Sequence, residues 1–251
     1  MKIISAVNHK GGVGKSTTVI SLSAGLARKG FKVLCVDLDA QCNLSSSICA
    51  ELYGIKESNI MHVLYGKTPA AEAIQHTAQG DIIVGSPSMS GADMVISSTG
   101  KEYRLKEALQ ALEAYDYIVI DTPPALGILT VNALAASTGC IIPAQADVYS
   151  LQGIAQLFET IQAVKKYCNP TLTVMGILIT RYSRLVIGRE IAEMLHDTAI
   201  RLNTKLYSSK IRECAAIKES QAVKNNIFDY APKSNAALDY EAFVAELLME
   251  E

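Results

Sequence analysis

The feature that most restricts the fold of this chain is a glycine-rich run near its amino end. Residues 8–18 read Asn-His-Lys-Gly-Gly-Val-Gly-Lys-Ser-Thr-Thr, between an apolar β-branched segment and a helical pattern. The glycines permit a tight loop whose backbone N–H groups turn inward toward one anion, and a helix that begins there adds the positive end of its dipole. The run therefore predicts a strand, a phosphate-binding loop and a helix in direct succession.

The spacing inside this loop differs from the common phosphate-binding pattern. A glycine usually stands five residues before Gly14, but this chain has His9 there and a second lysine at Lys10. Lys15 is expected to bring a point charge to the β- and γ-phosphates, and the Ser16 hydroxyl is placed to bind Mg²⁺. We expect His9 to have a structural rather than a catalytic role.

Two apolar strand segments end in carboxylates. Asp37 and Asp39 close the segment that begins at residue 32, and Asp121 follows the segment 117–120. Ligands of open α/β sheets sit at the carboxyl ends of strands, so these acids should emerge beside the phosphate-binding loop. Alternation along an extended chain points Asp37 and Asp39 in one direction, with a capped turn as the alternative. Asp121 is placed to reach Mg²⁺ through a bound water.

Short β-branched runs alternate with longer helical patterns along the chain. This alternation predicts an α/β fold with a twisted, mainly parallel sheet and helices on both faces. Hydrophobic residues make up 49% of the chain, which is enough for a large core, and no linker divides it, so residues 1–251 are predicted to form one domain. The segment 85–101 is interpreted as a surface loop. Strands are predicted at 3–7, 32–36, 81–84, 117–120, 140–143 and 173–179. Helices are predicted at 16–28, 103–114, 129–136, 151–167, 188–202 and 238–248.

Charge and cysteine content exclude several classes of protein. The net charge of −2 shows that the chain is not basic overall. No apolar run approaches the ~18–20 residues that span a bilayer. The six cysteines include no C-x-x-C pair, so free thiols in a reducing cytosol explain them best. Cys35, Cys42 and Cys49 are spaced by seven residues, but no histidine lies near them and we do not assign a metal site. The chain is expected to be cytoplasmic and not bound to a membrane.

Several motifs together resemble the deviant Walker A ATPases, and most closely the ParA/Soj partition ATPases. The resemblance covers essentially the whole chain and implies a single-domain P-loop NTPase fold. The loop at 10–17 is diagnostic of the superfamily, and the later motifs narrow the resemblance to the ParA branch. The matching segments are Lys10–Thr17, Asp37–Gln41, Asp121–Pro124, Ala144–Asp147, Ser150–Gly153 and Glu219–Pro232.

The resemblance implies a role for each matching residue. Lys10 would be the signature lysine that reaches the partner's phosphates across an ATP-sandwiched homodimer, and Lys15 would be the P-loop lysine. Ser16 and Asp121 would hold Mg²⁺, and Asp39 would position the attacking water, so that catalysis rests on positioning and electrostatics. The residues assigned to nucleotide binding are Lys10, Gly11, Gly12, Val13, Gly14, Lys15, Ser16, Thr17 and Arg212.

Two positions depart from the family pattern. Ala40 stands where the family has a proline after the second acid, which would loosen this loop. Ile211-Arg212 stands where many relatives carry Ile-Pro beside the adenine, so the base contacts there are left open.

The resemblance also implies two macromolecular partners: non-specific DNA and a ParB-like centromere-binding protein that stimulates slow ATP hydrolysis. ATP-bound dimers would then associate with the nucleoid. Residues 181–233 hold 10 Lys and Arg against 6 Asp and Glu, a net charge of +4. A basic face there would contact phosphates without reading sequence, although ordinary solvated charges are the alternative. The candidates for DNA contacts are Arg181, Arg184, Arg189, Lys218 and Lys224.

Rival functions within the superfamily differ in specific residues. A MinD-type membrane ATPase ends in a basic amphipathic helix, but residues 239–251 contain five acids and no lysine or arginine. A nitrogenase-type iron protein would need cluster cysteines, and none follows Asp121 in the segment 122–125. Two alternatives stay open: a MinD-like or other deviant Walker A ATPase that acts as a nucleotide switch with binding as its output, and an ATP-dependent metabolic enzyme of the dethiobiotin-synthetase type.

Overall fold

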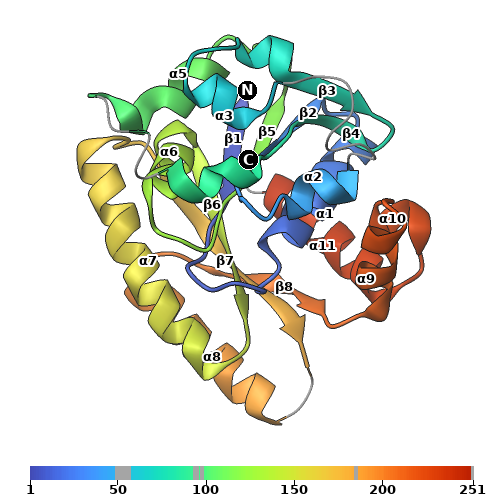
Figure 1. Ribbon diagram of the computed structural model, residues 1–251. Coiled ribbons are helices and arrows are strands. Elements are labelled where there is room, and N and C mark those ends of the chain that lie inside the picture. The colour runs from blue at the N-terminus through green and yellow to red at the C-terminus, as the bar shows by residue number, and fades with distance from the viewer. Residues whose placement is uncertain (49–57, 93–95, 97–98, 184–185, 250–251) are drawn as a thin grey trace.

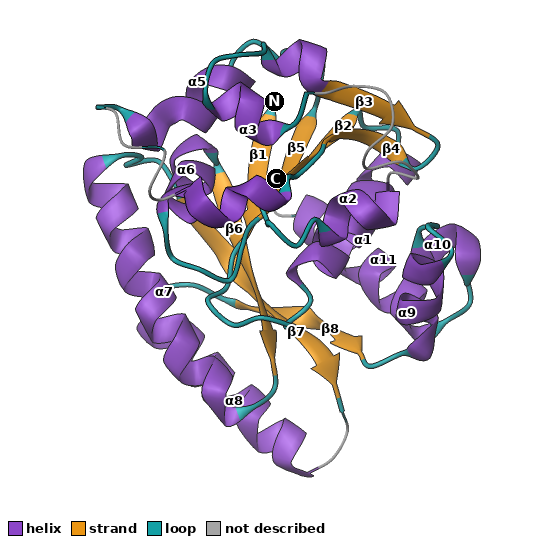
Figure 2. Ribbon diagram, viewed as in Figure 1, coloured by secondary structure: helices purple, strands orange, loops and turns teal. Residues whose placement is uncertain are grey.

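An eight-stranded sheet forms the centre of the molecule in the computed structural model, which describes residues 1–48, 58–92, 96, 99–183 and 186–249 (Figures 1 and 2). The strand order is β3-β4-β2-β5-β1-β6-β7-β8, and among these strands only β3 runs antiparallel to its neighbour. The bounds are β1 Lys2–Ala6, β2 Val33–Asp37, β3 Ile74–Thr77, β4 Gly80–Ile83, β5 Tyr117–Asp121, β6 Gly139–Gln145, β7 Thr173–Tyr182 and β8 Leu206–Arg212.

Helices cover both faces of this sheet (Figure 2). In the described residues they are α1 Lys15–Arg28, α2 Asn43–Ile48, α3 Ile60–Leu64, α5 Arg104–Leu109, α6 Ile128–Ala136, α7 Val148–Tyr167, α8 Val186–Arg201, α9 Ala215–Ala222, α10 Ile227–Tyr230 and α11 Asn235–Leu248. Short 3-10 helices lie at Ala70–Ala73, Pro87–Gly91 and Lys101–Tyr103. None of the helices in these described ranges is long and apolar enough to cross a membrane.

The strands are buried on both faces, as their continuous apolar sequences predict. On β5, Ile118 and Ile120 join the cluster that α3, α5 and α6 contribute to, whereas Val119 joins the cluster of α1, α10 and α11 on the opposite face. Helix α1 approaches α11 closely at Gly25, where an added Cβ would lie 2.7 Å from Val244 Cγ2. This contact explains a glycine in the middle of a helix and fixes α1, which begins at the phosphate-binding loop.

The predicted α/β class and mainly parallel sheet are confirmed, and all six predicted strands are present with bounds that differ by one to three residues. Two strands were not predicted, β3 and β8, and α5 ends earlier than the expected helix at 103–114. The interpretation of 85–101 as a surface loop is wrong in part, because Met89, Ala92 and Ile96 are buried in the core between β2, α3 and α5.

Strand β8 lies at one edge of the sheet, and helix α11 lies against it. Two carboxylates of α11 accept hydrogen bonds from backbone N–H groups of this strand. Glu246 accepts from Ser208 at 2.7 Å and from Ser209 at 2.9 Å, and Asp239 accepts from Arg212 at 2.9 Å. Two of the five acids that distinguish this segment from a basic amphipathic helix therefore attach α11 to the sheet.

Candidate nucleotide-binding site

The loop between β1 and α1 has the backbone that its glycines predict. Gly12 and Gly14 have φ angles of 74° and 86°, in the left-handed region that favours glycine. Gly14 is the N-cap of α1, and no side chain accepts a hydrogen bond there. The first N–H groups of α1 therefore fit an anionic ligand at this helix end.

Lys15 is buried at the start of α1, with 6% of its surface exposed. Its Nζ donates to the backbone carbonyl of Lys10 at 3.2 Å. Burial lowers the pKa of Lys15, and the negative charges of Asp121 and Asp39 oppose that shift. The ammonium group thus lies beside the loop and close enough to interact with the charges of two acids. A phosphate bound in the loop would contact the same ammonium group.

Asp37 and Asp121 are neighbours in the register of β2 and β5, at the carboxyl ends of both strands. Asp121 is fully buried, and neither of its carboxylate oxygens has a hydrogen-bond partner of normal geometry among the described residues. Burial and the nearby Asp37 raise the pKa of Asp121 well above its ordinary value, while a weaker interaction with the Ser16 hydroxyl and the charge of Lys15 oppose the rise. A buried carboxylate beside a hydroxyl and without a donor of its own fits a divalent cation.

The two acids at the end of β2 differ in their surroundings. Asp37 accepts hydrogen bonds from the backbone N–H of Asp39 at 3.0 Å, from the N–H of Ser45 at 2.9 Å and from the Ser45 hydroxyl at 2.6 Å. Burial raises the pKa of Asp37 to about 6, although these hydrogen bonds oppose the shift. Asp39 accepts a hydrogen bond from the N–H of Gln41 at 3.0 Å. Both acids therefore accept turn N–H groups, as in the capped-turn alternative, but among the described contacts Asp37 is bound by three donors, whereas Asp39 keeps acceptor capacity for a ligand or water.

Lys10 forms an ion pair with Asp147 of its own chain. Asp147 is the N-cap of α7 and accepts hydrogen bonds from the N–H and the hydroxyl of Ser150 at 3.0 and 3.1 Å. Burial acts to raise the pKa of Asp147, but the hydrogen bonds from Lys10 and Ser150 outweigh it and the pKa is lowered. His9 Nδ1 lies 3.0 Å from Gln156 Oε1 on the surface, which agrees with a structural role.

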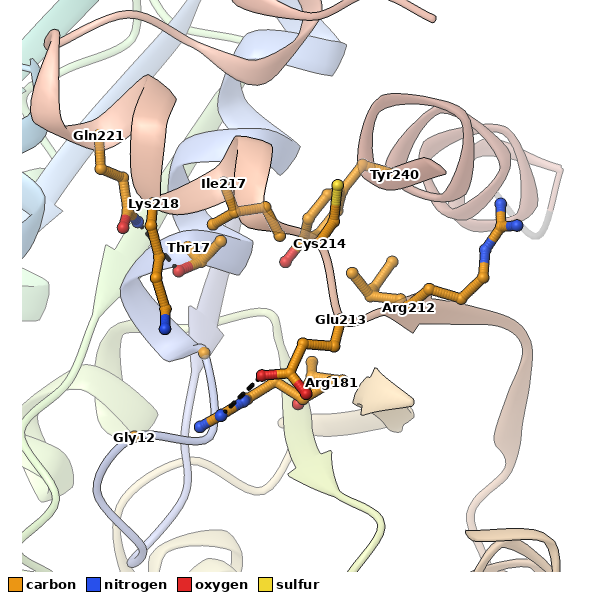
Figure 3. Close-up of a pocket in the computed structure, with 13 residues that line it drawn as sticks. Gly12, Thr17, Arg181, Arg212, Glu213, Cys214, Ile217, Lys218, Gln221 and Tyr240 are labelled. Atoms are coloured by element: carbon orange, nitrogen blue, oxygen red, sulfur yellow. Dashed lines mark hydrogen bonds and ion pairs between the residues drawn. The ribbon is translucent and has the colours of Figure 1, made fainter. Parts of the chain in front are cut away.

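A cavity of about 170 Å³ adjoins the loop, between the start of α1 and helix α9 (Figure 3). Arg181 and Glu213 form an ion pair at its rim with an N–O distance of 2.9 Å, and Gln221 donates to the Thr17 hydroxyl at 3.1 Å. Because this cavity continues from the phosphate-binding loop, it has the position that a nucleoside would occupy. Its lining consists of Gly12, Gly14, Thr17, Thr180, Arg181, Ile211, Arg212, Glu213, Cys214, Ile217, Lys218, Gln221 and Tyr240.

Sequence reasoning did not identify most of the lining that α9 and α11 contribute. Ile217, Gln221 and Tyr240 belong to no chemical motif, and only the likeness of 219–232 to a family signature pointed to this region. The guanidinium of Arg212, which was assigned to the nucleotide, points away from the cavity (Figure 3) and pairs with Asp239 on α11 at 2.6 Å.

Three of the five candidates for DNA contacts, Arg181, Lys218 and Lys224, lie in the described part of the structure. Arg181 and Lys218 line the cavity, and Lys218 extends from α9 toward the loop at Gly12 (Figure 3). Lys224 follows α9 with a φ of 53°. Arg189 belongs to α8 but its side chain lies outside the described part of the structure, as does all of Arg184. Cys49 is outside as well, and the described residues contain no cluster of metal-binding side chains.

Comparisons with known proteins agree with this geometry. A family profile described as AAA domain matches residues 1–174. The chain is 35% identical to the sporulation initiation inhibitor protein Soj of Bacillus subtilis, over 95% of each chain. It is 36% identical to the chromosome partitioning protein ParA of Myxococcus xanthus, over 98% of this chain and 88% of that one.

Solved structures share the fold. One is a cobyrinic acid a,c-diamide synthase from Mycobacterium smegmatis with bound ADP and magnesium, at 31% identity and a TM-score of 0.86, covering 100% of this chain and 95% of the other. Another is a plasmid partition protein from Borrelia burgdorferi, at 29% identity and a TM-score of 0.74, covering 92% and 98%. With the loop, the acids and these relatives taken together, the chain belongs to the ParA/Soj family of P-loop ATPases.

Proposed function

We propose that residues 1–251 form a single ATPase domain that binds ATP with Mg²⁺, dimerises around the nucleotide and hydrolyses it slowly. The observation that carries this proposal is the fully buried Asp121, whose carboxylate has no hydrogen-bond donor of normal geometry among the described residues. It lies within the electrostatic reach of Lys15 and Ser16, at the phosphate-binding loop. A cation at this position would compensate the buried charge.

Each residue of the site has a role in this reaction. The loop amides of 11–14 and the Lys15 ammonium would hold the β- and γ-phosphates, and Ser16 and Asp121 would hold Mg²⁺. When bound, Mg²⁺ supplies positive charge that stabilises the transferred phosphoryl group. Asp39 would accept a hydrogen bond from the attacking water and orient it. Catalysis therefore rests on positioning and electrostatics, with no covalent intermediate on the protein.

The relatives from Myxococcus xanthus and Borrelia burgdorferi, which are named for chromosome and plasmid partition, support a biological role. We propose that the ATP-bound dimer binds DNA without sequence preference and acts with a ParB-like centromere-binding protein. The pair would segregate a plasmid, a mobile element or a chromosome in the cytoplasm, with the ATP-bound form on the nucleoid. Contacts limited to DNA phosphates would weaken steeply as salt concentration rises.

The ATPase rate tests this role directly. We expect a slow basal rate that rises several-fold only when non-specific duplex DNA and a ParB-like centromere-binding protein from the same organism are both present. The control omits each component in turn. If the ATPase rate did not change with either component but depended on a small organic acid as a second substrate, the result would instead support a metabolic enzyme of the dethiobiotin-synthetase type.

Replacing Lys10 with alanine is expected to leave ATP binding by the monomer within about threefold and to weaken ATP-dependent dimerisation at least about tenfold. The Lys15 ammonium and the loop amides already surround the phosphates of their own subunit, so a second lysine is most useful across an interface. DNA affinity should fall with dimerisation, because two linked half-sites gain effective concentration. Light scattering with MgATP and DNA titrations measure both effects.

Asp147→Asn is the matched variant for Lys10. Asparagine keeps an N-cap oxygen for Ser150 but removes the charge that holds Lys10 in its own chain. We expect this variant to dimerise with ATP at least as well as the parent protein. If Lys10→Ala dimerised with ATP as strongly as the parent protein, Lys10 would have a role only within its own loop.

A further inference from the structure

A buried hydrogen-bond network connects three segments next to the catalytic loop. It joins Asp37 at the end of β2, Ser45 in the first turn of α2, and Gly85 just after β4. The Ser45 hydroxyl donates to Asp37 Oδ2 at 2.6 Å and accepts from the Gly85 N–H at 2.9 Å. Asp37 and Ser45 are both fully buried. Since none of the sequence motifs includes Ser45 or Gly85, the nucleotide site as described so far gives them no role.

Asp37 holds both ends of the turn that carries Asp39. Its Oδ1 accepts from the Asp39 N–H at 3.0 Å, before the turn, and its Oδ2 accepts from the Ser45 N–H at 2.9 Å, after it. Inside the turn, the Cys42 N–H donates to the Asp39 carbonyl at 2.8 Å, and Cys42 has a φ of 51°. A residue other than glycine stays in the left-handed region only where the surrounding structure holds it there. These hydrogen bonds therefore define the conformation of the turn.

Gly85 packs directly against Asp37. A Cβ added at Gly85 would lie 3.0 Å from Asp37 Cγ, 3.2 Å from its Oδ2 and 3.1 Å from Met89 Cε. The carboxylate is thus held by three donors on one side and by close packing on the other. A displacement of Asp37 would move the Asp39 N–H with it.

We propose that Ser45 and Gly85 are positioning residues for ATP hydrolysis, which act through Asp37 to place the Asp39 carboxylate. This inference rests on the proposed role of Asp39 in orienting the attacking water. Both oxygens of Asp37 are engaged by the protein, so Asp37 supports the reaction without touching the substrate. The hydrogen bonds of this network join Asp37 to Asp39 and Ser45, and Ser45 to Gly85, and they do not involve the Lys15 ammonium or the loop amides that would hold the phosphates. Loss of the network should therefore lower kcat and leave ATP affinity unchanged.

Two substitutions disturb this network in different ways. Ser45→Ala removes one donor from Asp37 and the acceptor of the Gly85 N–H, and we expect kcat to fall about tenfold with the Kd for ATP within about twofold. Gly85→Ala keeps every hydrogen bond but presses on Asp37 by a few tenths of an ångström. Since a misplacement of about 1 Å can reduce the rate about a hundredfold, we expect this smaller shift to lower kcat about threefold.

Ser137→Ala is the matched control. Ser137 is also buried, and its hydroxyl donates to the backbone carbonyl of Ala133 at 2.7 Å. It precedes β6 and so lies near the amino end of a strand, whereas Asp37 lies at the carboxyl end of β2. We expect a comparable loss of thermal stability and an unchanged kcat. Single-turnover hydrolysis, normalised to the bound ATP, measures kcat per folded molecule in all variants.

The outcomes separate this inference from the function on which it rests. Wild-type kcat in both Ser45→Ala and Gly85→Ala, with slow hydrolysis in Asp39→Ala, would overturn the positioning role alone. An equal fall in Ser137→Ala would also overturn it, because the effect would then be general. Wild-type hydrolysis in Asp39→Ala would instead refute the proposed function. If Ser45→Ala does not fold, Gly85→Ala decides the question.

Discussion

Lys15→Ala is expected to lower the affinity for ATP about a hundredfold or more and to abolish measurable hydrolysis. The Lys15 ammonium is buried beside the loop, and without it Asp121 and Asp39 would face the phosphates with no cation of the protein to offset them. Loss of one such preorganised charge or donor typically reduces a rate by about 10²–10³. Titration with a fluorescent ATP analogue and a phosphate-release assay measure both effects.

Lys29→Ala provides the control, because Lys29 lies at the opposite end of the same helix and is exposed. Both variants should fold. Thermal unfolding without nucleotide, measured for both variants, separates a loss of ATP binding from a loss of folding. ATP affinity near that of the parent protein in Lys15→Ala would refute the assignment of the loop.

Asp39→Ala is expected to bind ATP normally, to hydrolyse it about a hundredfold more slowly and to accumulate as an ATP-bound dimer. In the described part of the chain the Asp39 side chain accepts a hydrogen bond from the Gln41 N–H, and it lies close enough to Lys15 to influence the pKa of that lysine. In its proposed role this carboxylate would orient water without binding the phosphates, so its loss should affect kcat and not affinity. Single-turnover hydrolysis and sedimentation with MgATP measure the two outcomes.

Asp39→Asn separates the charge of this residue from the shape of its turn. Asparagine keeps an oxygen that accepts the Gln41 N–H, so the turn is retained while the carboxylate is lost. Hydrolysis as slow as in Asp39→Ala would assign the effect to the carboxylate. An Asp39→Ala protein that stays monomeric with MgATP would contradict the role given to this residue.

Local patterns in the sequence were sufficient for the loop and for six of the eight strands. The glycines at 11, 12 and 14 and the lysine that follows them determine the loop by themselves, and continuous apolar runs mark strands that are covered on both faces. Strand β8 reads Leu-Tyr-Ser-Ser-Lys-Ile-Arg and was not predicted, because its two serines and its lysine interrupt any apolar run. It is a strand because β7 pairs with it and α11 supplies acceptors for its N–H groups.

Contacts between segments that are distant in the chain could not be predicted from the sequence. Lys10 and Asp147 are 137 residues apart, and their ion pair depends on the packing of α7 beside the loop. Asp37 and Asp39 look equivalent in the sequence, but Ser45 and Gly85 make only Asp37 structural. Residues 181–233 have a net positive charge, yet its distribution between the nucleotide cavity and the outer surface follows from the fold.

The attachment of α11 to β8 has a consequence for the behaviour of the chain at high concentration. An uncovered edge strand offers a row of N–H and C=O groups that can pair with another molecule and begin aggregation. Here Glu246 and Asp239 already accept the N–H groups of Ser208, Ser209 and Arg212. The opposite edge is β3, a strand of only four residues. Edge-to-edge growth of the sheet is therefore disfavoured at both ends, so the dimer proposed above would form without competition from sheet extension.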